Sequence, residues 1–365
     1  MHSTGSGPLL QTVTGTPTDI WNDSCATDEL RWAIEHGATG ATSNPAIVAE
    51  VMQKEWEVWA PRVREIAAEH PDWTDVEVTW RIIEEMAARG AAVLEPIFVR
   101  HAGRKGRLSI QTNPTFHSST DRMLQQARGF DALAPNMQVK FPATSAGIAA
   151  MEQATFEGIS INATVSFTLP QALAVGEAVE RGLQRREADG LDVSRMAPVC
   201  TLMLGRLDDW IKAVCDRDDI VVDPAAPNWA GLAVFKRAAA IYRERGFRTR
   251  PLAAAYRNLQ HWTELVGGDL VMTMTHQWQR RFEASGLVVR PRFDEPVPAA
   301  SVAELLDRVP DFRQAYEPEG LTLPEIDDYG ATLHTLRIFT ASYWGLVKTI
   351  DDLLLPDPTI RRRPG

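Results

Sequence analysis

Short apolar segments recur along the chain, and each one stops at a polar residue. In residues 137–142, Met137, Val139 and Phe141 alternate with Gln138 and Lys140, which is the period of two typical of a β-strand. The pattern predicts eight strands, at residues 18–23, 37–45, 107–112, 137–142, 159–164, 197–203, 251–257 and 268–275.

Segments with the apolar spacing of helices lie between these strands. The first of them begins with Thr27, a residue type that caps helix N-termini, and stops at Gly37. Eight strands that each feed a helix over residues 16–289 predict an α/β fold, a (β/α)8 TIM barrel. An open doubly wound sheet is the alternative, but no G-x-G-x-x-G motif follows an early strand.

Two segments interrupt the alternation of strands and helices. Residues 46–106 carry two long helical patterns, at 48–70 and 74–90, and then a basic loop at 101–107 that we interpret as solvated. Residues 290–301 are proline-rich, and two or three helices follow them to about Leu355. We therefore expect three parts: an N-terminal tail at 1–15, a barrel at 16–289 that includes the helical insertion 46–106, and a C-terminal helical extension at 290–365 that packs on the barrel.

The charge of the chain limits the kind of partner. The 365 residues carry a formal net charge of −10, with a pI near 5.4, whereas binders of nucleic acid or anionic membranes are normally basic. No apolar run reaches the ~18 residues of a membrane span, and the N-terminal stretch has no signal-peptide pattern. We expect a cytoplasmic protein, and a homo-oligomer is one of the open alternatives for its oligomeric state. Cys25, Cys200 and Cys215 lack C-x-x-C spacing, so no metal site is expected.

Lys140 is the residue whose position most needs an explanation. In a barrel, one face of each strand meets the helices and the other points into the interior, so Gln138 and Lys140 are predicted to point inward. Lys140 also lies at the carboxyl end of its strand, where barrel enzymes place catalytic groups. Burial lowers the pKa of a lysine, and the neutral amine can then attack a carbonyl and form a Schiff base.

Polar residues stand at many of the other strand ends. Each has an ordinary explanation, for example a helix cap, a turn former before a proline or a surface arginine. Together they are hard to explain by packing, and they indicate one site at the carboxyl end of the barrel. The residues are Asp23, Asn44, Gln111, Asn162, Thr164, Thr201, Arg206 and Arg257.

Four segments of the chain resemble the transaldolases. "GATSNPAIV" is similar to the T-[TS]-N-P signature after the second strand of that family, and residues 136–172 are similar to the segment with its Schiff-base lysine and following N-x-T. "LGRLDDW" and "AAAYRN" match its two arginine-bearing segments. The resemblance covers residues 16–285 except for the insertion, which fits poorly. It implies a (β/α)8 barrel that needs no metal or organic cofactor and acts on sugar phosphates.

The resemblance also implies roles for individual residues. Lys140 would be the Schiff-base nucleophile, and Asp23 would move protons at the substrate hydroxyls and the leaving carbonyl. Thr164 would belong to an acid/base relay through a water, to which Gln111 is adjacent. The substrate-binding residues would be Asn44, Thr42, Asn162 and Thr201 around the dihydroxyacetone part, and Arg206 and Arg257 at the phosphate.

The chain departs from the family pattern at several positions. Gln111 stands where the family usually has a catalytic glutamate, and a glutamine can hold a water but cannot shuttle a proton at neutral pH. In the related fructose-6-phosphate aldolase branch a glutamine works beside a tyrosine, but here Met203 and Phe167 occupy the nearby positions. Thr201 and Ala255 replace two serines of the family.

Three functions stay open at this point. A transaldolase that moves a dihydroxyacetone unit between sugar phosphates is favoured by the resemblance. An aldolase-type lyase, or a relative with an altered substrate, is favoured by Gln111, Ala255 and the insertion. A catalytically silent sugar-phosphate-binding barrel would bind ligand through the arginines without forming a covalent adduct.

Overall fold

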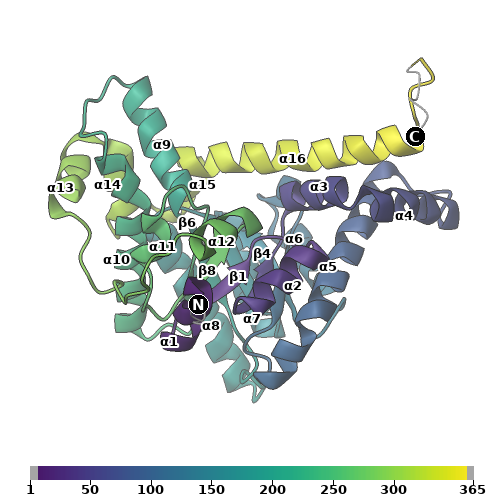
Figure 1. Cartoon of the computed structure of the whole chain (residues 1–365), viewed down its shortest axis with the longest axis horizontal. Coiled ribbons are helices and arrows are strands. Elements are labelled where there is room, and N and C mark those ends of the chain that lie inside the picture. The colour runs from purple at the N-terminus through teal and green to yellow at the C-terminus, as the bar shows by residue number, and fades with distance from the viewer. Residues whose placement is uncertain (1–6, 360–365) are drawn as a thin grey trace, which may run out of the picture.

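Eight parallel strands form a closed barrel in the computed structural model, which describes residues 7–359 (Figure 1). The strands pair in chain order, and β8 pairs with β1. The predicted (β/α)8 TIM barrel is therefore confirmed. The seventh strand ends three residues earlier than expected, because Ala255 has φ 64° and leaves the extended conformation. The strands are β1 (Asp19–Asn22), β2 (Ala38–Thr42), β3 (Arg107–Gln111), β4 (Met137–Pro142), β5 (Ile161–Ser166), β6 (Val199–Met203), β7 (Arg250–Ala254) and β8 (Val271–Met274).

Helices cover the outer face of the barrel. The outward residues of β4 (Met137, Val139 and Phe141) are almost fully buried in the apolar core between strands and helices, as the alternation along this strand predicts. The elements between and after the strands are α2 (Thr27–Glu35), η1 (Pro114–Phe116), α6 (Thr120–Asp131), α7 (Ser145–Glu157), α8 (Leu169–Ala188), α9 (Leu204–Arg217), η2 (Ala226–Trp229), α10 (Ala230–Arg245), α11 (Gln260–Thr263) and α12 (His276–Glu283).

The insertion between β2 and β3 holds three helices, not the two that its sequence predicts: α3 (Pro45–Lys54), α4 (Trp56–Glu69) and α5 (Asp75–Arg100). The first pattern breaks at Glu55, whose carboxylate accepts hydrogen bonds from the Thr27 backbone N–H (3.2 Å) and from Trp59 Nε1 (2.9 Å). The second helical pattern continues beyond residue 90, because the side chains of Leu94 and Phe98 are buried and anchor the next turns of α5.

The two ends of the described chain also differ from the expectation. Residues 8–15 of the expected tail form α1 (Pro8–Gly15), in which Leu9 is fully buried, while residues 1–6 lie outside the described range. Within residues 290–359 the C-terminal extension forms four helices, because Pro310 cannot continue the preceding helix and starts a new one. They are α13 (Ala299–Arg308), α14 (Pro310–Tyr316), α15 (Leu323–Asp328) and α16 (Gly330–Leu354). None of the helices in residues 7–359 is long and apolar enough to cross a membrane.

Helix α16 crosses the carboxyl end of the barrel (Figure 1). It contacts β5, η1, α3 and α9, which all lie at or directly follow the carboxyl ends of strands. Gln171 Nε2 at the start of α8 donates a hydrogen bond to Thr332 Oγ1 of α16 (3.3 Å), and both residues are fully buried. Helix α16 therefore covers the end of the barrel at which the predicted site residues lie.

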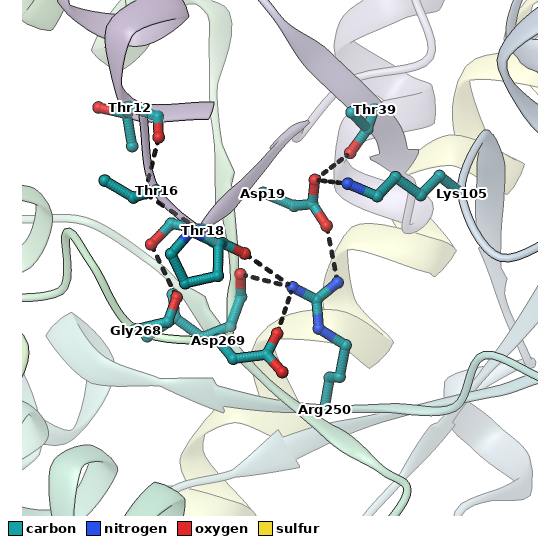
Figure 2. Close-up of polar contacts among 11 residues, drawn as sticks. Thr12, Thr16, Thr18, Asp19, Thr39, Lys105, Arg250, Gly268 and Asp269 are labelled. Carbon is teal, nitrogen blue, oxygen red and sulfur yellow. Dashed lines mark hydrogen bonds and ion pairs between the residues drawn. The ribbon is translucent and has the colours of Figure 1, made fainter. Parts of the chain in front are cut away.

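A different polar cluster links the strands at the amino-terminal end of the barrel. The Asp19 carboxylate accepts from Lys105 Nζ (2.7 Å), Arg250 Nη1 (2.7 Å) and Thr39 Oγ1 (3.3 Å), as Figure 2 shows. Burial raises the pKa of the Asp19 carboxyl, but Arg250 and Lys105 outweigh that effect and hold the pKa below its ordinary value. Asp19 is therefore an anion that ties β1 to β2, to β7 and to the basic loop at 101–107.

Candidate active site

Lys140 lies inside the barrel, as its place in the alternation predicts. Its side chain is on the inner face of β4, and only 4 % of the residue is exposed. In the strand register it stands opposite Gln111 of β3 and Asn162 of β5. Paired residues of neighbouring parallel strands point to the same face of a sheet, so these three side chains form one layer of the barrel interior.

The surroundings of Lys140 favour a neutral amine. Burial lowers the pKa of the Lys140 ammonium, the Asp23 carboxylate partly opposes this shift, and the Arg206 guanidinium adds to it. Within residues 7–359, no hydrogen bond or ion pair holds Lys140 Nζ. A buried amine that keeps its lone pair and has no fixed partner is suited to attack a carbonyl carbon.

Asp23 directly follows β1 and is held by a threonine of β2, which is itself paired with a threonine of β8. Thr42 Oγ1 of β2 donates a hydrogen bond to Asp23 Oδ1 (2.5 Å), and it also lies 2.8 Å from Thr273 Oγ1 of β8. The backbone N–H of Asp23 donates to the Met274 carbonyl (2.8 Å). Thr42 is therefore a positioning residue for the carboxylate. Thr273 was not predicted, although its alternation with the methionines of β8 places it on the inner face.

Asn162 is fixed by a chain of hydrogen bonds through the barrel interior. Thr201 Oγ1 donates to Asn162 Oδ1 (2.6 Å), and Asn162 Nδ2 donates to Ser109 Oγ (3.1 Å). Ser109 in turn donates to Gln138 Oε1 (2.6 Å), whose Nε2 donates to the Ala197 carbonyl (2.8 Å). All four side chains are buried. Gln138 is the second inward residue of β4. This series of hydrogen bonds explains it as a support for the layer that contains Lys140.

Gln111 and Thr164 have unused hydrogen-bonding capacity. Both residues are buried, and neither Gln111 Oε1 nor Thr164 Oγ1 has a partner among the described residues. Gln111 is opposite Lys140 in the register, and Thr164 is opposite Pro142, one layer nearer the carboxyl end. Buried polar atoms are normally satisfied, so these two oxygens mark the place where a water or a substrate hydroxyl would bind.

Asn44 serves as a helix cap in this structure. Its Oδ1 accepts a hydrogen bond from the Ile47 backbone N–H (3.0 Å) at the start of α3. This is the ordinary structural explanation that its place before Pro45 suggests. Its Nδ2 makes no hydrogen bond with another described residue, so the cap leaves the amide donors free.

Arg206 and Arg257 are brought together by a close approach of two loops. The Gly205 backbone N–H donates to the Ala255 carbonyl (3.1 Å), and a Cβ at Gly205 would lie only 2.1 Å from that oxygen. Glycine is therefore required where α9 begins, next to the end of β7. The approach places the two guanidinium groups near enough that Arg257, after the larger effect of burial, lowers the pKa of Arg206.

The two arginines differ in their partners. Arg257 Nε binds Asp209 Oδ2 (2.9 Å), whereas Arg206 has no ion pair among the described residues and lies over the ring of Phe339 from α16 (5.4 Å to the ring centre). An unpaired guanidinium beside a second one is a ready site for a doubly charged anion, because both present planar sets of N–H donors.

A buried pair behind Arg257 was not predicted from the sequence. His261 Nδ1 accepts the Arg257 backbone N–H (3.2 Å), and His261 Nε2 lies 2.9 Å from Asp208 Oδ2, with both side chains fully buried. Asp208 Oδ1 also accepts the Gly231 N–H (2.8 Å). The pair fixes the backbone from which Arg257 extends. Its only signal in the sequence is an aspartate on the buried face of α9.

The described residues hold no group of three or more His, Cys, Asp or Glu side chains arranged to bind a metal ion. The site instead combines an amine of lowered pKa, one half-buried carboxylate, neutral hydrogen-bonding side chains and two guanidinium groups. Such a set can form a covalent imine with a carbonyl, move a proton at a nearby hydroxyl and hold an anionic group at the mouth.

Comparisons with known proteins show what the chain is similar to. The family model described as transaldolase/fructose-6-phosphate aldolase matches residues 20–316. A transaldolase of Thermobifida fusca (strain YX) is 31 % identical over 211 residues, which are 55 % of this chain and 56 % of that protein. A transaldolase of Thiobacillus denitrificans (strain ATCC 25259 / T1) is 33 % identical over 204 residues, 53 % of this chain and 55 % of that protein.

A longer match is found in mycobacteria. A transaldolase of Mycobacterium marinum (strain ATCC BAA-535 / M) is 29 % identical over 297 residues, which are 73 % of this chain and 79 % of that protein. The matches to the Thermobifida and Thiobacillus proteins span little more than half of the length of those relatives. The identity to these three relatives is therefore modest, between 29 % and 33 %.

Proposed function

Because the chain belongs to the transaldolase/fructose-6-phosphate aldolase family, we propose that it transfers a dihydroxyacetone unit from a ketose phosphate to an aldose phosphate through a Schiff base on Lys140. The observation that carries the proposal is the burial of Lys140 inside the barrel, with its pKa lowered chiefly by that burial and with the Asp23 carboxylate close enough to act on it electrostatically. Proteins of this family that are similar to the chain are named transaldolases.

The first half of the reaction makes and uses an iminium ion. Lys140 Nζ adds to the C2 carbonyl of the ketose phosphate, and loss of water gives the iminium. Gln111 and Thr164 hold that water, because their side-chain oxygens are buried inside the barrel and have no partner among the described residues. Asp23, oriented by Thr42, takes the proton of the C4 hydroxyl. The C3–C4 bond then breaks, the iminium accepts the electron pair, and an aldose phosphate leaves.

The second half reverses these steps with another aldehyde. The enamine on Lys140 attacks the carbonyl carbon of the acceptor, Asp23 returns the proton to the new hydroxyl, and water releases the product ketose. Asn162 binds the dihydroxyacetone hydroxyls without adding charge beside the iminium, and Thr201 keeps its amide in place. Asn44 offers its free amide donors to the same unit. Arg206 and Arg257 bind the phosphate group.

Helix α16 supports transfer over simple cleavage. It covers the carboxyl end of the barrel, and its Phe339 lies against Arg206. A covered site keeps water from protonating the enamine before an acceptor arrives.

One observation favours a second candidate, an aldolase-type lyase that releases free dihydroxyacetone. Gln111 is the only side chain opposite Lys140 on β3, and it cannot relay a proton at neutral pH as a glutamate can. A weaker proton relay would shift the balance from attack on an acceptor toward hydrolysis of the enamine, which is the outcome of a lyase.

The experiment that tests the proposal is reduction with borohydride in the presence of fructose 6-phosphate, followed by intact mass and peptide mapping. We expect a reduced three-carbon adduct on Lys140, and no adduct in a Lys140→Met variant. A transferase then consumes fructose 6-phosphate only when an acceptor aldose phosphate is added, whereas a lyase releases dihydroxyacetone without one. If no ketose phosphate gives an adduct, the proposal is wrong and the catalytically silent binding barrel is favoured instead.

A further inference from the structure

A second cavity enters the barrel from its amino-terminal end, opposite to the candidate active site. Its volume is about 360 Å³. Asp19 on its wall begins β1 and Asp23 in the candidate site directly follows the same strand, which separates them by roughly 13 Å at the rise of an extended chain. The lining residues are Pro17, Asp19, Trp21, Arg104, Lys105, Met196, Ala197, Pro198, Val199, Arg248, Arg250, Asp269 and Val271.

The inner part of this cavity is apolar. Trp21, Val199 and Val271 belong to a small apolar cluster inside the barrel that is separate from the main core. Each of the three is at most 5 % exposed. Met196 and two prolines continue this apolar wall toward the outside. The surface is therefore suited to a flat or compact apolar group.

The outer part of the cavity is cationic. Four arginine or lysine side chains line it, against two aspartates. Asp19 already accepts three hydrogen bonds from Lys105, Arg250 and Thr39, as Figure 2 shows, and Asp269 binds Arg250 (2.9 Å). Both carboxylates are thus engaged by the cations of the cluster.

Two of the cationic groups keep donors without partners. The side chain of Arg104 makes no hydrogen bond or ion pair with any described residue, and the buried Nε of Arg250 also has none. Arg248 differs from them, because Glu180 and Glu187 each bind it at 2.6 Å. Arg104 belongs to the basic loop at 101–107, which the sequence analysis interprets as solvated. In the structure this loop contributes an unpaired guanidinium group to the cavity.

We propose that this cavity binds a small organic anion that has an apolar group, with a carboxylate or phosphate head beside Arg104 and the apolar group against Trp21. The proposal does not rest on the proposed function, because it uses none of the residues at the carboxyl end of the barrel. An apolar floor and a cationic rim bind such a ligand more tightly than they bind an inorganic anion or a neutral aromatic compound, since each of those uses only one half of the site.

The test is isothermal titration of the full-length protein with phenyl phosphate, with inorganic phosphate and phenol as the two half-ligands. We expect phenyl phosphate to bind at least about tenfold more tightly than either one. Arg104→Ala is expected to weaken phenyl phosphate binding by about tenfold or more, as a lost charged hydrogen bond does. The matched control is Arg100→Ala, an exposed arginine nearby that does not line the cavity.

An Arg206→Ala variant separates this cavity from the candidate active site, where phosphate also is expected to bind. If the cavity is the site, Arg206→Ala leaves phenyl phosphate binding unchanged while Arg104→Ala weakens it. The proposal is overturned if Arg104→Ala binds like the unaltered protein, if binding is lost with Arg206→Ala instead, or if inorganic phosphate binds as tightly as phenyl phosphate.

Discussion

Replacing Lys140 by methionine should stabilise the fold while it removes the covalent chemistry. The change keeps the side-chain volume and removes a cation whose pKa is lowered chiefly by burial. Replacing a whole buried ion pair by apolar residues of similar volume is often neutral or stabilises a protein by about 1–4 kcal/mol, and Lys140, which has no ion pair among the described residues, carries the cost of burying a charge without that compensation. Because Asp23 loses a neighbouring positive charge in the variant, we expect the lower part of that range, about 1–2 kcal/mol at pH 7.

The stabilisation should depend on pH in a defined direction. At pH values below the pKa of Lys140 in the folded protein, the amine is charged in both states and the cost of burying the charge is fully present. As the pH rises through that lowered pKa toward the ordinary value of 10.5, the folded protein releases its proton first and the cost disappears. The advantage of Lys140→Met should therefore shrink as the pH approaches 10.5.

Urea denaturation of both proteins between pH 6 and 10 measures this difference in the free energy of unfolding. Lys212→Met, at a half-buried position on α9, is the matched control and should change stability by at most about 0.5 kcal/mol. A Lys140→Met variant that is less stable than the unaltered protein at pH 7, or whose advantage does not vary with pH, would refute the argument that Lys140 is buried at a cost.

Three further predictions concern neighbours of Lys140 and the phosphate end of the site. Gln111→Glu should raise the rate of transfer from fructose 6-phosphate, because it restores an ionisable group; an unchanged or lower rate in a folded variant would indicate a site built for other chemistry. Thr201→Val should lower the free energy of unfolding by about 1–3 kcal/mol, since Asn162 Oδ1 loses its donor, and Thr201→Ser should not. Ala255→Gly should raise it by up to about 1 kcal/mol, because φ 64° strains an alanine; urea titration that shows a loss would contradict this.

The barrel and the inward position of the central residues of the candidate site could be predicted from the sequence because their signals are local. The alternation in residues 137–142 gives both the strand and the inward direction of Lys140, and Asn162 and Thr164 follow from the same period in β5. The carboxyl ends of parallel strands in a closed barrel meet at one end. For that reason polar strand ends that are far apart in the chain converge on one site.

The remaining features depend on contacts between distant segments. His261 and Asp208 are 53 residues apart, and Phe339 reaches Arg206 from a helix near the end of the chain, so no local period connects them. The predicted helix boundaries in the insertion were wrong for a related reason. Glu55 interrupts a continuous helical pattern because its side chain bonds to a neighbouring helix, and that partner cannot be read from the pattern itself.

Helix α16 has a consequence for how the protein is made. Its residues, Gly330–Leu354, are the last described helix of the chain, yet they cover the end of the barrel where Lys140 and the two arginines lie. All eight strands leave the ribosome before this helix does. During synthesis the barrel can therefore close while its carboxyl end is still uncovered, and Lys140 becomes sheltered only after residues 330–354 have been made.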